Sequence, residues 1–244
     1  MLLKDFNKTI AEIVRSDYRT ADVFRKYGIT YCCTDKDFLL EICTVKNLDY
    51  NKILEELDTV TRNVIVPNTL QFSQWKIDFL VDYIVNVHHA YMHTTIPFIE
   101  DSLVSFIEEH QKKYPELNSV LFLFRELSVL LMKHSRHEEE IIFPYIKQIE
   151  STHRRREIYG NLFVRTLRKP LSNIEKDHEV ILSVLKEIQS LTHNYNCPDN
   201  TCAIQFAIYH KLEEFHNDMM QHTHLEDDVL FPRAIEMEKE LLQL

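Results

Sequence analysis

Apolar residues recur every three to four positions through most of this chain, which is the spacing of one face of an α-helix. From Ser73 onward this pattern fills four long segments, and we predict a helix for each. Three polar or proline-containing breaks separate them, at 112–115, 151–160 and 194–200. Four long helices with short connections predict an up-down-up-down bundle.

The first 62 residues carry shorter helical segments with their own end signals. One segment ends at Gly28, Thr34 is expected to cap a helix over 37–43, and Asp49 to cap another. The stretch that contains Pro67 lacks helical periodicity. We therefore predict a small N-terminal helical domain over 1–62, a linker over 63–72 and the bundle over 73–244.

Composition supports an all-α fold and excludes several classes of protein. The chain has only two glycines, whereas a dinucleotide-binding fingerprint needs three and a phosphate loop needs two close together. It has no Asn-Gly or Asp-Gly pair for a tight β-hairpin. The net charge of −10 argues against a nucleic-acid partner, since phosphates attract a basic face.

The sequence also favours a reducing, cytoplasmic setting. No apolar run approaches the length that spans a bilayer, so we expect no membrane partner. Lys4 and Asp5 lie where a signal peptide would need its apolar core. The five cysteines are an odd number and form no CxxC motif.

Three prolines lie inside helical patterns. Pro97, Pro144 and Pro232 remove a backbone donor, so each predicts a kink, with a helix end as the alternative.

Two segments repeat each other at an offset of 88 residues, and they carry the candidate chemistry. Each has the form HxxxE, then two acids, two aliphatic residues and Phe-Pro, as in His134/Glu138 and His222/Glu226. The i, i+4 spacing places imidazole and carboxylate on one helix face, where they can bind one ion. His153 and His210 also begin an HxxxE, so the matched flank is the evidence rather than the motif itself.

Histidines on the other two helices fall at the same level of the bundle. In antiparallel helices, two residues share a level when the turn lies midway between them. The residue midway between His134 and His222 is His178, and both turns then fall in the predicted breaks. His88 stands in the same relation to His134 across the first break. We therefore expect all four helices to bring a histidine to one layer of the core.

The expected ligands are four imidazoles and two carboxylates without a thiolate, which suits iron or manganese better than structural zinc. Six ligands in a two-fold repeat predict two ions, each with two histidines, bridged by both glutamates. A bridging hydroxide or oxide would supply further negative charge. The predicted set is His88, His134, Glu138, His178, His222 and Glu226.

Several neighbouring residues have a plainer interpretation. Glu139, Asp177 and Asp227 can support the ligands from outside, but each fits a solvated helix face better. His89 and His137 adjoin predicted ligands, and a register error of one residue would exchange them. The other histidines are expected to be ordinary core or surface residues: His93, His110, His153, His193, His210, His216 and His224.

These motifs resemble the di-iron proteins that repair iron–sulfur clusters, the RIC family of ScdA or YtfE type. Residues 73–244 resemble a hemerythrin-like bundle through the two repeats and Glu175-Lys-Asp-His-Glu179. Residues 5–60 resemble the family's short N-terminal domain through Phe24-Arg-Lys-Tyr-Gly-Ile29 and Tyr31-Cys-Cys33. The resemblance implies a di-iron centre held by all six residues, with both glutamates bridging.

The resemblance also implies a function. It suggests repair of iron–sulfur clusters damaged by nitric oxide or oxidants, through iron donation or chemistry with NO, O2 or peroxide, with damaged iron–sulfur proteins as partners. Cys32 and Cys33 would take part, although Thr34-Asp35 replaces the two glycines that often follow this pair. A carrier or sensor of O2 or NO, and a di-iron reductase of NO or peroxide, are the alternatives. The sequence leaves open whether the chain is an enzyme and whether it forms a homodimer.

Overall fold

The structure is a computed structural model that describes residues 8–31, 37–62, 70–110, 112, 114–155, 172–198 and 201–243. Over these ranges the chain is helical, and its only β pairing is one isolated bridge between Thr9 and Phe38. The predicted all-α class is confirmed. The division into 1–62, 63–72 and 73–244 stays a prediction.

Four short helices form the N-terminal part, and local signals set their ends. Thr9 and Glu12 form a reciprocal capping box at the start of α1. Gly28 has a φ of +62°, and the Ile29 N–H bonds to the Phe24 carbonyl, a left-handed turn that closes α2. Asp49 caps α4 as expected, by accepting from the Lys52 N–H. The helices are α1 (Ile10–Ser16), α2 (Thr20–Lys26), α3 (Leu39–Val45) and α4 (Tyr50–Val60).

The third of these helices differs from the prediction. It begins at Leu39, and its N-cap is Phe38, which has no side-chain oxygen to offer a cap bond. The Ile10 N–H bonds to the Asp37 carbonyl, and Phe38 pairs with Thr9 in the isolated bridge. This bridge holds the chain extended up to the helix. Thr34 itself lies outside the described residues.

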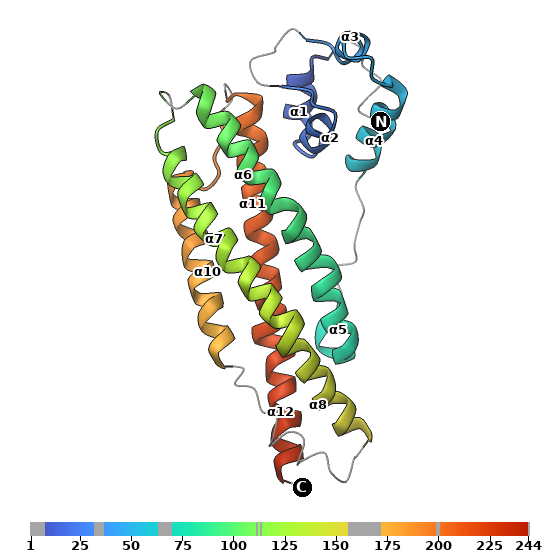
Figure 1. Cartoon of the computed structure of the whole chain (residues 1–244), viewed down its shortest axis with the longest axis vertical. Coiled ribbons are helices and arrows are strands. Elements are labelled where there is room, and N and C mark those ends of the chain that lie inside the picture. Colours follow the sequence, from blue (N-terminus) through green and yellow to red (C-terminus); the bar gives the residue numbers. More distant parts are fainter. Residues whose placement is uncertain are drawn as a thin grey trace.

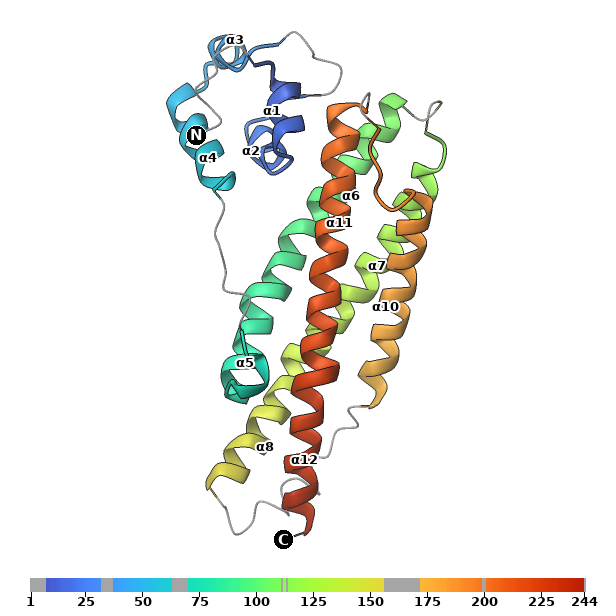
Figure 2. The ribbon, with the colours of Figure 1, turned by 180° about the vertical axis from the view of Figure 1, so that it is seen from behind.

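Four long helical rods follow, and Figures 1 and 2 show them side by side along the molecule. A short 3-10 turn, η1 (Phe72–Gln74), precedes them. Three of the rods contain a π-helical turn. The rods are α5 (Ile77–Tyr83), η2 (Ile84–His89) and α6 (Ala90–His110); α7 (Leu117–His137), η3 (Glu138–Ile142) and α8 (Phe143–Arg155); α10 (Ser172–Leu191); and α11 (Ala203–His224), η4 (Leu225–Leu230) and α12 (Phe231–Gln243).

Two of the π-turns explain how helices continue through proline. Pro144 and Pro232 each stand two residues after the end of such a turn. Just before them, the Phe143 N–H bonds to the Glu138 carbonyl and the Phe231 N–H to the Glu226 carbonyl, five residues back instead of four. Because proline donates no hydrogen bond, the α-helical ladder is interrupted there, and the wider turn accommodates the gap. The predicted disturbances at both prolines are therefore π-turns.

The bundle core and the N-terminal part meet along α6 and α11. Large apolar side chains such as Phe106, Phe124 and Phe215 are fully buried between the rods. The core of the N-terminal part continues onto Ala203 and Ala207 of α11. Figure 2 shows α1 and α2 beside the upper halves of α6 and α11, so the N-terminal part lies against one side of the bundle near its end.

Candidate metal centre

Two groups of four buried side chains lie in the lower half of the bundle, at the level of the π-turns. The first group is His89, Glu138, His222 and Glu226, and the second is His134, Glu138, His178 and Glu226. Within each group the candidate ligand atoms all lie within 4.8 Å of one another. Both glutamates belong to both groups, and each is 0 % exposed.

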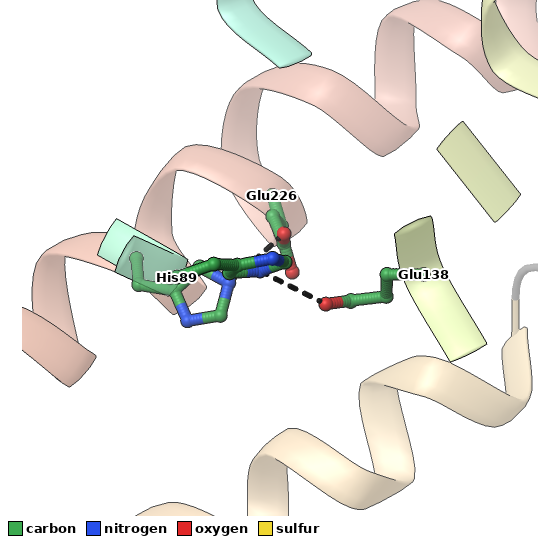
Figure 3. Close-up of side chains that lie close together, drawn as sticks. His89, Glu138 and Glu226 are labelled. Carbon is green, nitrogen blue, oxygen red and sulfur yellow. Dashed lines mark hydrogen bonds and ion pairs between the residues drawn. The ribbon is translucent and has the colours of Figure 1, made fainter. Parts of the chain in front are cut away.

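Each glutamate directs one oxygen to each group. Oε2 of Glu138 lies 3.4 Å from Nε2 of His89, and its Oε1 lies 3.0 Å from Nε2 of His134. Oε1 of Glu226 lies 3.0 Å from Nε2 of His222, and its Oε2 lies 3.1 Å from Nε2 of His178. Figure 3 shows His89 with Glu138 and Glu226 at its side. This is the arrangement that two carboxylates need to bridge two ions.

Each group combines histidines from both halves of the bundle. His89 and His134 come from the first two rods, and His178 and His222 from the last two. Each group takes one histidine from each half, so both halves contribute to both groups.

The polar atoms of this layer fit a metal better than they fit one another. Both carboxylate oxygens of Glu138, Oε2 of Glu226 and Nε2 of His89 are buried and make only ion-pair contacts, the nearest of 3.0 to 3.4 Å, none with the geometry of a hydrogen bond. Nε2 of His134 and Nε2 of His178 lie 2.9 Å apart, so two nitrogens that normally bind a proton or a metal face each other. Buried groups of this kind are costly without a partner. Two bound cations would satisfy them together.

Acidic residues just outside the two groups hold the histidine rings. Nδ1 of His89 lies 2.7 Å from Glu139, and Nδ1 of His178 lies 2.8 Å from Asp227. These bonds fix each ring with Nε2 pointing inward. Glu139 is exposed and Asp227 half-buried, so both lie at the solvated edge of the helices as expected, but both also support a histidine ring, the role that the sequence favoured less. Asp177 is more exposed and lies 3.6 Å from Nδ1 of His134.

The charges of the groups shift one another's pKa values. Burial opposes the charged imidazole, but hydrogen bonds and charge from Asp227 and Glu226 outweigh it and raise the pKa of His178 to about 10. Burial is likewise outweighed at His89 and His134, whose pKa values are raised by Glu138. At Glu226 burial opposes the carboxylate, yet His222 and His178 hold its pKa well below the usual range. Protons thus supply positive charge that a metal would otherwise bring.

Five of the six predicted residues come together, but His89 takes the place of His88. His88 is also buried, but its Nδ1 lies 3.0 Å from Asp218, and its ring stacks beside that of His222 without belonging to either group. Both histidines end the π-turn η2, whose extra residue shifts the side chains around the helix axis. The prediction of His88 assumes a regular α-helix at this level of the bundle. It therefore cannot distinguish His88 from its neighbour His89.

The other histidines and the cysteines are placed as follows. His137 is exposed, and His216 is a satisfied core residue whose Nδ1 lies 2.9 Å from the Tyr195 hydroxyl. Cys43 is a buried free thiol. Cys32 and Cys33 lie outside the described residues.

Comparison with known families agrees with this geometry. The family model described as "Hemerythrin HHE cation binding domain" matches residues 80–234, which contain both groups. The chain belongs to this family. A second model, ScdA_N, described as "Domain of Unknown function (DUF542)", matches residues 6–61.

Relatives of this hemerythrin-family chain share both parts. It is 25% identical over 226 residues to the iron-sulfur cluster repair protein ScdA of Staphylococcus epidermidis, covering 92% of this chain and 96% of the relative. It is 28% identical over 233 residues to the iron-sulfur cluster repair protein YtfE of Escherichia coli O157:H7, covering 94% and 97%. Within the described ranges, none of the helices is both long and apolar enough to cross a membrane.

Proposed function

We propose that the two groups hold two iron ions, with Glu138 and Glu226 as bridges. One ion would be bound by His89 and His222, and the other by His134 and His178. The observation that carries this proposal is that each carboxylate gives one oxygen to each group in a fully buried core. Imidazole and carboxylate without thiolate suit iron.

We propose further that the chain repairs iron–sulfur clusters damaged by nitrosative or oxidative stress. The support is the pair of relatives with that name, which match this chain over nearly its whole length. When bound, a di-iron centre supplies redox chemistry, coordination of NO, O2 or peroxide, and iron for donation. The partners would be damaged iron–sulfur proteins, and the setting the cytoplasm.

The chain's own residues would hold and protect this centre. The imidazoles of His89 and His178 are oriented by carboxylates, and the bridging glutamates are closed off from water. Protonation of these ligands would weaken the metal site, because iron and protons bind the same atoms. The role of Cys32 and Cys33 in repair is part of the proposal.

The first experiment measures metal content and iron charge-transfer absorption in freshly purified protein and in His134→Ala. We expect about two irons per chain in the wild type and a clear loss in the variant. Unchanged iron in the variant would contradict the ligand assignment.

The second experiment gives the iron-loaded protein a cluster enzyme inactivated by NO and measures its recovery. Recovery supports repair, whereas a protein that binds NO or O2 reversibly without restoring the enzyme is a carrier. Turnover of NO or peroxide with an electron donor, again without recovery, indicates a reductase. The Cys32→Ala/Cys33→Ala variant should bind these ligands normally and lose repair.

A further inference from the structure

A pocket lies at the end of the bundle where α6 connects to α7 and α10 to α11, away from the metal groups. It has a volume of about 320 Å³, within the range of small-molecule sites, and opens between the α6–α7 and α10–α11 connections. Gln205 in its wall and His222 of the metal groups stand on one helix, 17 residues and about 25 Å apart. The pocket is therefore separate from the proposed centre.

An unusual backbone turn forms one wall of this pocket. His193, Asn194 and Tyr195 have φ values of +51°, +61° and +56°, although none is a glycine. Each such residue costs about 1 kcal/mol or more. The turn is held by Tyr195, which is buried and bonded to His216, and by the Asn194 N–H, which bonds to the Gln189 carbonyl. It places His193 and Asn196 in the pocket wall.

The opposite wall offers hydrogen-bond acceptors and aromatic rings. Gln205 is only 6 % exposed, and its Oε1 is buried without a hydrogen-bond partner. Tyr114, Glu116 and Tyr209 line the same space. Burial raises the pKa of Tyr209, so its hydroxyl stays protonated. Among the described residues of the lining there is no lysine or arginine.

These features select the charge of the ligand. An unpartnered carbonyl oxygen requires a donor, a carboxylate favours a positive charge, and tyrosine faces attract cations. An anion would meet Glu116, and none of the described residues that line the pocket is a lysine or arginine that could offset this charge. We propose that this pocket binds a small organic cation that carries an ammonium or guanidinium group, oriented by Gln205 and Glu116.

The test titrates butylguanidinium into the metal-loaded full-length protein and follows backbone and side-chain amide NMR signals. Butyramide, a neutral molecule of similar length, and butyrate, an anion, serve as comparisons. We expect saturable shifts at His193, Asn196 and the Gln205 side-chain amide with butylguanidinium alone. Equal binding of butyramide or butyrate, or shifts that map elsewhere, would overturn the proposal.

Two variants assign the contributions. Glu116→Gln should weaken binding at least about threefold, the effect of one partly exposed charge. Glu116 makes no side-chain cap bond to α7, so this change leaves the helix start intact. Glu108→Gln removes the same charge from an exposed position on α6 and should bind as the wild type.

Gln205→Leu should weaken binding at least about fivefold, because the cation then has no acceptor there. Its fold is checked by the NMR signals of residues far from the pocket. If both pocket variants bind butylguanidinium as tightly as Glu108→Gln, the assignment is wrong.

Discussion

Single residues decide what the core of this bundle accepts. Glu138 and Glu226 are carboxylates that water does not reach, and each faces imidazoles on two sides. Without a metal, protons must balance them, and the raised pKa of His178 and the lowered pKa of Glu226 are two sides of that balance. Metal binding and protonation therefore compete.

This competition predicts opposite effects of pH on the two forms. Because the folded pKa of His178 is raised from 6.5 to about 10, its stabilisation of the metal-free protein is complete below pH 6.5 and is lost as the pH rises through 10. Metal affinity should instead rise with pH, since ligand histidines must be neutral. Melting curves of both forms between pH 6 and 10 test this.

Calorimetric titration in buffers of different ionisation enthalpy gives the complementary measurement. Metal loading near pH 7 should release about one proton or more per chain, because the raised pKa of His178 keeps this ring charged until a metal binds. Metal uptake without proton release would contradict the charge balance described above.

The neighbours His88 and His89 give the sharpest prediction at this scale. His89→Ala should lower the metal content and change the charge-transfer spectrum, because it removes a ligand from the first group. His88→Asn keeps a donor for Asp218 and should retain the metal. Loss of metal from His88→Asn with retention in His89→Ala would reverse the assignment.

At the scale of elements, each rod presents one face to the core and another to solvent. On α7, Phe124 is 0 % exposed and contacts Phe215 edge-on, whereas Phe122, two residues earlier, is 62 % exposed. Residues two apart on an α-helix lie on different sides of it, which accounts for this difference. Phe122 and Phe124 are therefore a matched pair of positions at which to compare the same substitution.

Phe124→Ala should lower the free energy of unfolding by about 3 to 5 kcal/mol, because it leaves a cavity between rods. Phe122→Ala should change it by less than about 0.5 kcal/mol. Urea unfolding of both variants makes the comparison. Equal losses would mean that the core face of α7 is wrongly placed.

The sequence predicts the parts of the site that depend on regular helices. The repeated flank identifies His134 and His222 with their glutamates, and antiparallel geometry adds His178. It cannot separate His88 from His89, because the π-turn η2 leaves no signal in hydrophobic spacing. It names Glu139, Asp177 and Asp227 as possible supports, but it could not tell which of them bond to a ligand, because those bonds depend on ring positions in the folded core.

At the scale of the whole molecule, a polar cluster connects the N-terminal part to the bundle. The Tyr18 hydroxyl donates to Glu214 of α11 at 2.5 Å, and Lys211 reaches both Glu214 and Asp22 of α2. Lys211 is 8 % exposed, whereas the side chains of Asp22 and Glu214 are 40 % and 30 % exposed, so a buried ammonium is balanced by two carboxylates at the edge of the interface. Arg25 adds a bond to the Phe98 carbonyl of α6. Such long-range contacts have no signature in the sequence.

Glu214→Ala should weaken this attachment by about 2 kcal/mol, since Tyr18 and Lys211 lose a charged partner. We expect faster amide hydrogen exchange in α1 and α2, with the metal content unchanged. Glu213→Ala removes the neighbouring charge, which pairs only with His210 within α11 among the described contacts, and is the control. Unchanged exchange in Glu214→Ala would show that the apolar contacts alone hold the two parts together.

Because each group takes one histidine from each half of the bundle, the site indicates how this fold could have arisen. His89 and His178 occupy equivalent places in two helical hairpins, and so do the two HxxxE segments. A two-fold rotation that superimposes the first hairpin on the second also superimposes the first group of ligands on the second group. A bundle of this form is what duplication and fusion of a single hairpin would leave, if that hairpin once bound metal only as a symmetrical pair.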